Sequence, residues 1–152
     1  MYEIYTDGAC SNNGNKDATG GWAFVVVHNG EIIHRSKGAE KNTTNQRMEL
    51  IACINACDWL AENLPFVGEV KVNSDSAYLC NCYSQNWWRN WEINGWRNSK
   101  KEPVANADLW KRLIPFFEMP NYTFLKVKGH STNTYNNIVD KMAVEARSSI
   151  SI

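Results

Sequence analysis

Residues 22–37, WAFVVVHNGEIIHRSK, carry the clearest secondary-structure signal in the first part of the sequence. Two strand-like runs flank the pair Asn29-Gly30, and Asn-Gly between such runs is the strongest short-range signal for a β-hairpin. A further strand-like run with polar side chains at every second position comes before them. The three predicted strands are residues 2–7, 22–28 and 31–37. We therefore expect the chain to begin with an antiparallel meander.

Downstream of this meander, helical and strand patterns alternate. Residues 42–45, NTTN, supply capping side chains before a predicted helix over 47–63, which Pro65 ends. Its apolar side chains have the i, i+3, i+4, i+7 spacing of a buried stripe, formed by Leu50, Cys53, Ile54, Cys57, Leu60 and Ala61. The remaining elements are strands 69–74 and 122–128, helical segments 76–91 and 106–117, and a last helix from about Tyr135. This order predicts an α/β fold in one domain, residues 1–152.

Composition and charge narrow the class of protein. The formal net charge is 0 and the pI is about 6.8, so any contact with nucleic acid requires a local basic patch. No apolar run approaches the roughly 20 residues that span a bilayer, and the start MYEI differs from a signal peptide. The five cysteines form no CxxC pair, which indicates reduced thiols and a cytoplasmic protein. Cys53 and Cys57 could share a metal, but small buried thiols are the favoured interpretation.

Four acidic residues lie in separate pieces of the chain, each at a place that can direct a carboxylate: Asp7, Glu49, Asp75 and Asp140. Two follow predicted strands, one lies in the first turn of a predicted helix, and one lies in the last helix. If the first and fourth strands are neighbours, the four can meet at one sheet edge. A cluster of carboxylates without His or Cys is an all-oxygen site that favours Mg²⁺ or Mn²⁺ over zinc. Two such ions held together can cleave phosphodiesters.

Each acidic residue also has a purely structural interpretation. A glutamate in a first helical turn favours the helix dipole, and an aspartate after a strand is often a turn former. The joint placement of all four, with glycine or serine beside two of them, favours a functional site.

Several ordered segments resemble ribonuclease HI of the bacterial type: Thr6-Asp7-Gly8-Ala9-Cys10, Thr43-Thr44-Asn45-Gln46-Arg47-Met48-Glu49-Leu50, Ser74-Asp75-Ser76, Asn106-Ala107-Asp108-Leu109-Trp110 and Val127-Lys128-Gly129-His130. The resemblance covers nearly the whole chain. It implies a ribonuclease H-like fold, with a five-stranded mixed sheet of order 3-2-1-4-5 and helices on both faces. It also implies hydrolysis of the RNA strand of RNA–DNA hybrids with two Mg²⁺ ions, for which Mn²⁺ can substitute.

The resemblance also implies roles for individual residues. The four carboxylates match metal-binding positions, and their chemistry leaves 5′-phosphate and 3′-hydroxyl ends. His130 matches a histidine that shuttles protons or helps the product leave. Positions along the minor groove match Cys10, Asn13, Asn45 and Gln46. Positions that hold phosphates of the DNA strand match Thr44, Arg47 and Asn106. The hybrid duplex is the expected partner. We expect the protein to be a monomer that binds no membrane and needs no obligatory protein partner.

A basic, aromatic segment offers a second substrate-binding element. Between Ser76 and Arg112 lie five of the seven tryptophans and six Lys or Arg against three acids, a net charge of +3 in a neutral protein. Aromatic side chains interleaved with bases suit a nucleic-acid backbone, and the segment resembles the basic protrusion of the family. We expect Trp87 and Trp96 to contact the DNA strand. We expect Trp91 and Trp110 to be partly structural.

Three departures from the family pattern bear on affinity. The loop from Asn12 to Gly21 is longer and lacks proline, and Ala77 replaces a common glutamine. Residues 92–94, EIN, stand where bacterial members carry a run of bases, which predicts weak and strongly salt-dependent binding.

Two other classes of protein compete with the hydrolase as interpretations of the sequence. A non-catalytic hybrid-binding module would typically lose carboxylates, and all four are present. An integrase-like transferase would leave the Met48-Glu49-Leu50 and Val127–His130 segments unexplained.

Overall fold

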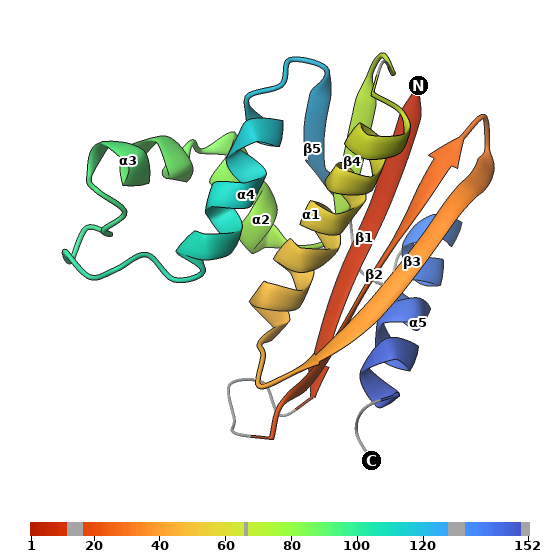
Figure 1. The fold of residues 1–152 in the computed structure, drawn as a ribbon, viewed down its shortest axis with the longest axis horizontal. Helices are drawn as coiled ribbons and strands as arrows, with labels where there is room; N and C mark the ends of the chain where they lie inside the picture. The colour runs from red at the N-terminus through yellow and green to blue at the C-terminus, as the bar shows by residue number, and fades with distance from the viewer. Residues whose placement is uncertain (12–16, 66, 128–132, 150–152) are drawn as a thin grey trace.

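The computed structural model describes residues 1–11, 17–65, 67–127 and 133–149. Its strands and helices alternate as the sequence predicts (Figure 1). In chain order they are β1 (Tyr2–Ser11), β2 (Thr19–His28), β3 (Glu31–Lys41), α1 (Asn45–Asn63), β4 (Val70–Ser74), α2 (Ala77–Ser84), α3 (Trp87–Ile93), α4 (Ala107–Phe117), β5 (Tyr122–Lys126) and α5 (Thr134–Ser148).

The five strands form one mixed sheet in the predicted order, β3-β2-β1-β4-β5. The first three are antiparallel, and β1 pairs with β4, and β4 with β5, in parallel. Asn29 and Gly30 join β2 to β3 with φ values of 52° and 76°, the left-handed conformation that a two-residue hairpin turn requires. The predicted meander and strand order are therefore confirmed.

Helices cover both faces of the sheet, as predicted. α1 packs on the face that carries Ile4, Phe24 and Val26, together with α2 and α4. α5 covers the opposite face, where Val139 packs against Tyr5, Val25 and Val27, and it lies behind the sheet in Figure 1. The predicted stripe of α1 is buried except for its last member: Ala61 is exposed, so its assignment to the core was wrong.

The boundaries of several elements differ from the predictions. β1 and β3 extend to Ser11 and Lys41 because β2 begins at Thr19 and pairs with both of these residues. α1 begins at Asn45, so Glu49 lies beyond its first turn rather than in it. The helix predicted over 76–91 is two helices, because the backbone of Asn86 is left-handed with φ 58° and interrupts it.

α3 and the segment that follows it form a protrusion, residues 87–106, which projects away from the sheet in Figure 1. Its chain is closed by two backbone hydrogen bonds of Trp96, which donates to the Trp91 carbonyl at 2.7 Å and accepts from the Val104 N–H at 3.0 Å. The Trp91 ring lies 5.7 Å from that of the fully buried Trp110. The protrusion is therefore anchored to the core through its tryptophans.

No helix in the described part of the chain is long and apolar enough to cross a membrane.

Close contact between α5 and β2 generates a test of this packing. A Cβ at Gly21 would collide with the backbone of Ala143 and Arg147 in α5, so Gly21→Ala forces the helix away from the sheet. We expect the substitution to lower the free energy of unfolding by about 1–3 kcal/mol in urea denaturation. Gly68→Ala is the matched control, because a Cβ there meets nothing within 4 Å. Equal stability of the two variants would contradict the packing described.

Candidate active site

The end of the pairing between β1 and β4 places two carboxylates side by side. The last paired residues are Thr6 and Ser74, so Asp7 and Asp75 are the residues that directly follow the paired parts of two adjacent parallel strands. Asp7 was predicted at the end of its strand, but β1 continues to Ser11 with β2 as its only remaining neighbour. Asp7 shares the α5 face of the sheet with Tyr5 because side chains alternate along a strand.

A glycine brings the third carboxylate to this place from the other face. A Cβ at Gly8 would collide with the backbone of Met48 and Glu49, so α1 can contact β1 only where the side chain is absent. Glu49 therefore lies beside the end of β4, where it accepts a hydrogen bond from Ser76 and experiences the charge of Asp75. The fourth carboxylate, Asp140, comes from α5 and lies close enough to Asp7 to raise the pKa of Asp7.

Burial and mutual repulsion raise the pKa values of this group. Asp7 is 5% exposed, and burial, then the charge of Asp75 and the contact with Asp140, raise its pKa from an ordinary 3.8 to about 9. Burial raises the pKa of Glu49 to about 7, and the charge of Asp75 adds to this effect, which the Ser76 hydrogen bond opposes. The charge of Asp75 raises the pKa values of both Asp7 and Glu49, so Asp75 is the member that these two share as a neighbour.

The donor set fits a hard divalent cation. Its oxygens come from four carboxylates, and a cation would offset the burial and the repulsion that keep a proton on Asp7 near neutral pH. In the described ranges no three His, Cys, Asp or Glu side chains are already grouped closely enough to hold a metal ion.

The predicted phosphate-binding residues meet at the start of α1. Thr44 caps this helix, and its Oγ1 accepts a hydrogen bond from the Arg47 backbone N–H at 3.1 Å. The Arg47 guanidinium donates from Nη1 to Oδ1 of Asn106 at 3.2 Å, which joins α1 to the start of α4. All three predicted residues are thus brought together although the sequence separates them by up to 62 positions.

Three of the four predicted minor-groove residues lie near the same helix start. The Cys10 thiol donates to the Thr43 carbonyl at 3.6 Å, and Asn45 and Gln46 are exposed at the first two positions of α1. Asn13, like His130, lies outside the described residues.

Comparisons with known proteins agree with this geometry. A sequence model of the RNase H family matches residues 1–148. A protein of Caldicellulosiruptor saccharolyticus named ribonuclease H is 47% identical over 140 residues, which is 92% of this chain and 91% of that protein. The chain belongs to the ribonuclease H family.

Solved structures place this ribonuclease H in the same fold. The solution structure of the PFV RNase H domain has a TM-score of 0.77 at 25% identity, over 97% of this chain and 94% of that one. LC11-RNase H1 in complex with RNA/DNA hybrid has a TM-score of 0.70 at 22% identity, over 98% of both chains. The resemblance inferred from the sequence and the predicted fold are both confirmed. Enzymes of this family depend on divalent metal ions.

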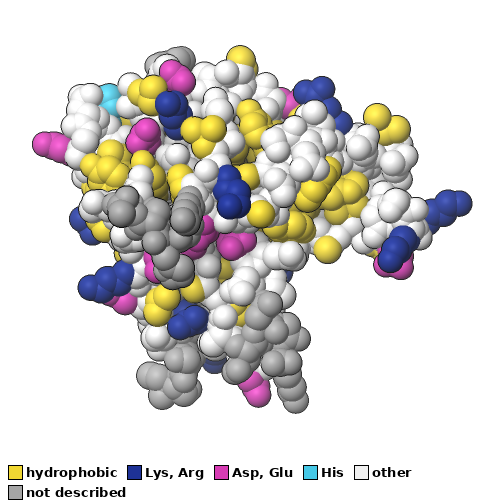
Figure 2. Space-filling view, turned by 180° about the vertical axis from the view of Figure 1, so that it is seen from behind, with side chains coloured by type: hydrophobic (Ala, Val, Ile, Leu, Met, Phe, Trp, Pro, Cys, Tyr) yellow, Lys and Arg dark blue, Asp and Glu magenta, His cyan; other side chains and the backbone are white. Residues whose placement is uncertain are grey.

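The protrusion of this ribonuclease H combines aromatic, amide and basic side chains. Figure 2 shows hydrophobic side chains along it and Lys and Arg at its outer end. A hollow of about 390 Å³ is lined by Trp87, Asn90, Trp91, Asn94, Arg97, Asn98 and Ser99. Trp87 and Trp96 are half-buried against the core, and the Lys111 ammonium lies 5.0 Å from the centre of the Trp96 ring. Trp110 is fully buried, which confirms its structural role.

Two residues of the polar network at the start of α1 received no role from the sequence. Asp108 accepts two hydrogen bonds from Arg47, and the Tyr78 hydroxyl accepts from Asn106 at 3.2 Å and from Trp110 at 3.1 Å. The position of Asp108 two residues after Asn106 was a usable signal, because both lie at the start of one helix. Nothing in the sequence pattern indicated Tyr78, which comes from α2.

The raised pKa values generate a prediction about stability without added metal. Between pH 4 and 9 the unfolded Asp7 carboxyl is ionised while the folded one keeps its proton, so folding binds protons and stability falls as pH rises. Glu49 adds to this fall up to about pH 7. Asp7→Asn removes the larger part of this pH dependence. We expect the free energy of unfolding of the variant to exceed that of the wild type by at least about 1 kcal/mol at pH 8.

Urea unfolding from pH 5 to 9 in EDTA measures this difference. Glu62→Gln, an exposed change on α1, is the control and follows the wild type. Parallel curves for Asp7→Asn and the wild type across that range would contradict a protonated Asp7.

Proposed function

We propose that this ribonuclease H is an endonuclease that hydrolyses the RNA strand of RNA–DNA hybrids. The observation that carries the proposal is one electrostatically linked group of four carboxylates, contributed by β1, α1, the end of β4 and α5, in a chain of this family. The family name, and the neighbour that binds an RNA/DNA hybrid, support the choice of substrate.

The residues proposed to hold two Mg²⁺ ions are Asp7, Glu49, Asp75 and Asp140, with Mn²⁺ as a possible substitute. Such a pair of cations supplies an activated water and stabilises the leaving 3′ oxygen, which leaves 5′-phosphate and 3′-hydroxyl ends. Asp75 is the member that interacts with both Asp7 and Glu49, so it is the position where loss of charge disrupts the whole cluster. His130 remains a predicted proton shuttle.

Recognition of the hybrid is proposed to use the start of α1 and the protrusion. The 2′-hydroxyl distinguishes RNA from DNA, and the exposed amides of Asn45 and Gln46, with Cys10 beside them, can bond to it. Arg47 and Asn106, which are joined by a hydrogen bond, are proposed to hold a phosphate of the DNA strand. Trp87 and Trp96 offer ring surfaces to the same strand further along.

A strand-specific cleavage assay tests the activity. Hybrids labelled at the end of either the RNA or the DNA strand are incubated with Mg²⁺ or with EDTA. The proposal requires that only RNA is cut and that EDTA abolishes cutting. Binding of the hybrid without cleavage in Mg²⁺ and in Mn²⁺ would favour a non-catalytic binding module instead.

A single substitution tests the assignment of the cluster. Asp75→Asn keeps the shape of the side chain but removes its charge, so we expect a folded protein whose kcat for hybrid cleavage falls by about two to four orders of magnitude. Glu62→Gln is the control that removes an exposed acid from α1 and keeps full activity. Wild-type kcat in Asp75→Asn, with an unchanged circular dichroism spectrum, would rule the assignment out.

A further inference from the structure

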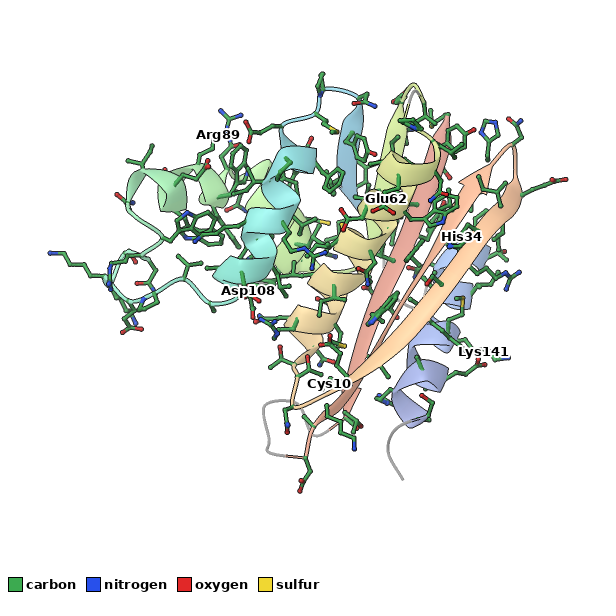
Figure 3. The ribbon with its side chains drawn as sticks, viewed as in Figure 1. Cys10, His34, Glu62, Arg89, Asp108 and Lys141 are labelled. Atoms are coloured by element: carbon green, nitrogen blue, oxygen red, sulfur yellow. The ribbon has the colours of Figure 1, made fainter. Side chains whose placement is uncertain are left out.

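The guanidinium of Arg47 is bound by a carboxylate at the place where the proposed function puts a phosphate. Nη2 of Arg47 donates to Oδ2 of Asp108 at 3.0 Å, and Nη1 donates to Oδ1 of Asp108 at 3.2 Å. Two parallel N–H···O bonds are the geometry in which arginine holds either a carboxylate or a phosphate. Figure 3 labels Asp108 at the start of α4, close to the start of α1.

The position of Arg47 is fixed from two sides. Its backbone N–H is held by the cap of α1, and its Nη1 also donates to Asn106. Asn106 has a left-handed backbone with φ 60° and donates to the Tyr78 hydroxyl, which also accepts from the buried Trp110. These bonds connect the guanidinium to the core. Within the described residues the bond to Asn106 and the two bonds to Asp108 occupy three of the five guanidinium N–H groups, which leaves the Nε side for another ligand.

The charges around this guanidinium oppose a phosphate. Arg47 lies close enough to Glu40 and Asp108 that both acids raise its pKa, and the contact with Arg47 lowers the pKa of Asp108. One positive charge therefore faces two negative ones. Asp108 is 64% exposed on its side chain and Arg47 is 32% exposed, so an incoming phosphate can reach both.

We propose that Asp108 limits the affinity for the hybrid by holding Arg47 in the manner of a phosphate. The inference rests on the proposed function, because it takes the DNA strand as the ligand of Arg47. The Asp108 carboxylate keeps the guanidinium oriented but repels the phosphate. The phosphate must either share the guanidinium with Asp108 or displace Asp108 from it. Asp108 is thus an affinity-determining residue and has no part in the chemistry.

A purely structural role for Asp108 makes a different prediction. An aspartate in the first turn of a helix stabilises the helix dipole, and its ion pair joins α4 to α1. If this were its only role, Asp108→Asn would lower the melting temperature and leave hybrid affinity unchanged. The chain contains a matched control, because Asp58 pairs with Arg112 at 3.1 Å between the same two helices, further from the start of α1.

The test measures binding of a fluorescent 18-base-pair RNA–DNA hybrid by anisotropy in EDTA, from 50 to 200 mM salt. We expect Asp108→Asn to bind about threefold more tightly than the wild type at 100 mM salt. We expect its log Kd to depend more steeply on log salt, by up to about 0.9, because one more phosphate contact is neutralised. Asp58→Asn should stay within about 1.5-fold of the wild type.

A second background shows whether Asp108 acts through Arg47. In Arg47→Ala, adding Asp108→Asn should change the Kd no more than Asp58→Asn does. A persistent threefold gain there would show a long-range charge effect and overturn the inference, as would unchanged or weaker binding by Asp108→Asn alone. A wild type that cleaves hybrids while Asp108→Asn gains nothing refutes only this inference. A wild type that neither cleaves nor binds hybrids refutes the proposed function as well.

Discussion

Burial of a carboxyl group beside other carboxylates is the constraint on which the arrangement of this site depends. Asp7 is nearly buried beside Asp75 and Asp140, and the pKa of Asp7 is raised to about 9 as a result. A group of this kind opposes folding unless other contacts offset it.

Two close approaches of backbone to backbone bring helices α1 and α5 to the sheet near the site. Gly8 allows α1 to contact β1 directly, and Gly21 allows α5 to contact β2 on the opposite face. One helix brings Glu49 and the other brings Asp140, while the parallel pairing of β1 with β4 sets Asp7 beside Asp75. A carboxylate cluster supplied from both faces of a sheet needs contacts this close, because carboxylate side chains are short.

The sequence predicted the features that depend on local patterns or ordered motifs. The Asn29-Gly30 turn and the alternation of strands and helices predicted the meander and the α/β class. The family resemblance predicted the strand order, and the four separated acids predicted the cluster. Features set by tertiary pairing were missed. Strand β1 continues past Asp7 because β2 begins at Thr19, and the left-handed Asn86 divides a predicted helix. The Tyr78 contact was missed because no short-range pattern links α2 to the start of α4.

Proton release on metal binding shows whether Asp7 carries a proton in the metal-free protein. If Asp7 carries a proton that a bound cation displaces, Mg²⁺ binding at pH 7.5 releases a proton. Calorimetric titration of Mg²⁺ in two buffers with different ionisation enthalpies counts the protons released. We expect the wild type to release close to one proton on Mg²⁺ binding, and Asp7→Asn to release markedly less. Mg²⁺ binding without proton release, or equal release by both proteins, would contradict this expectation.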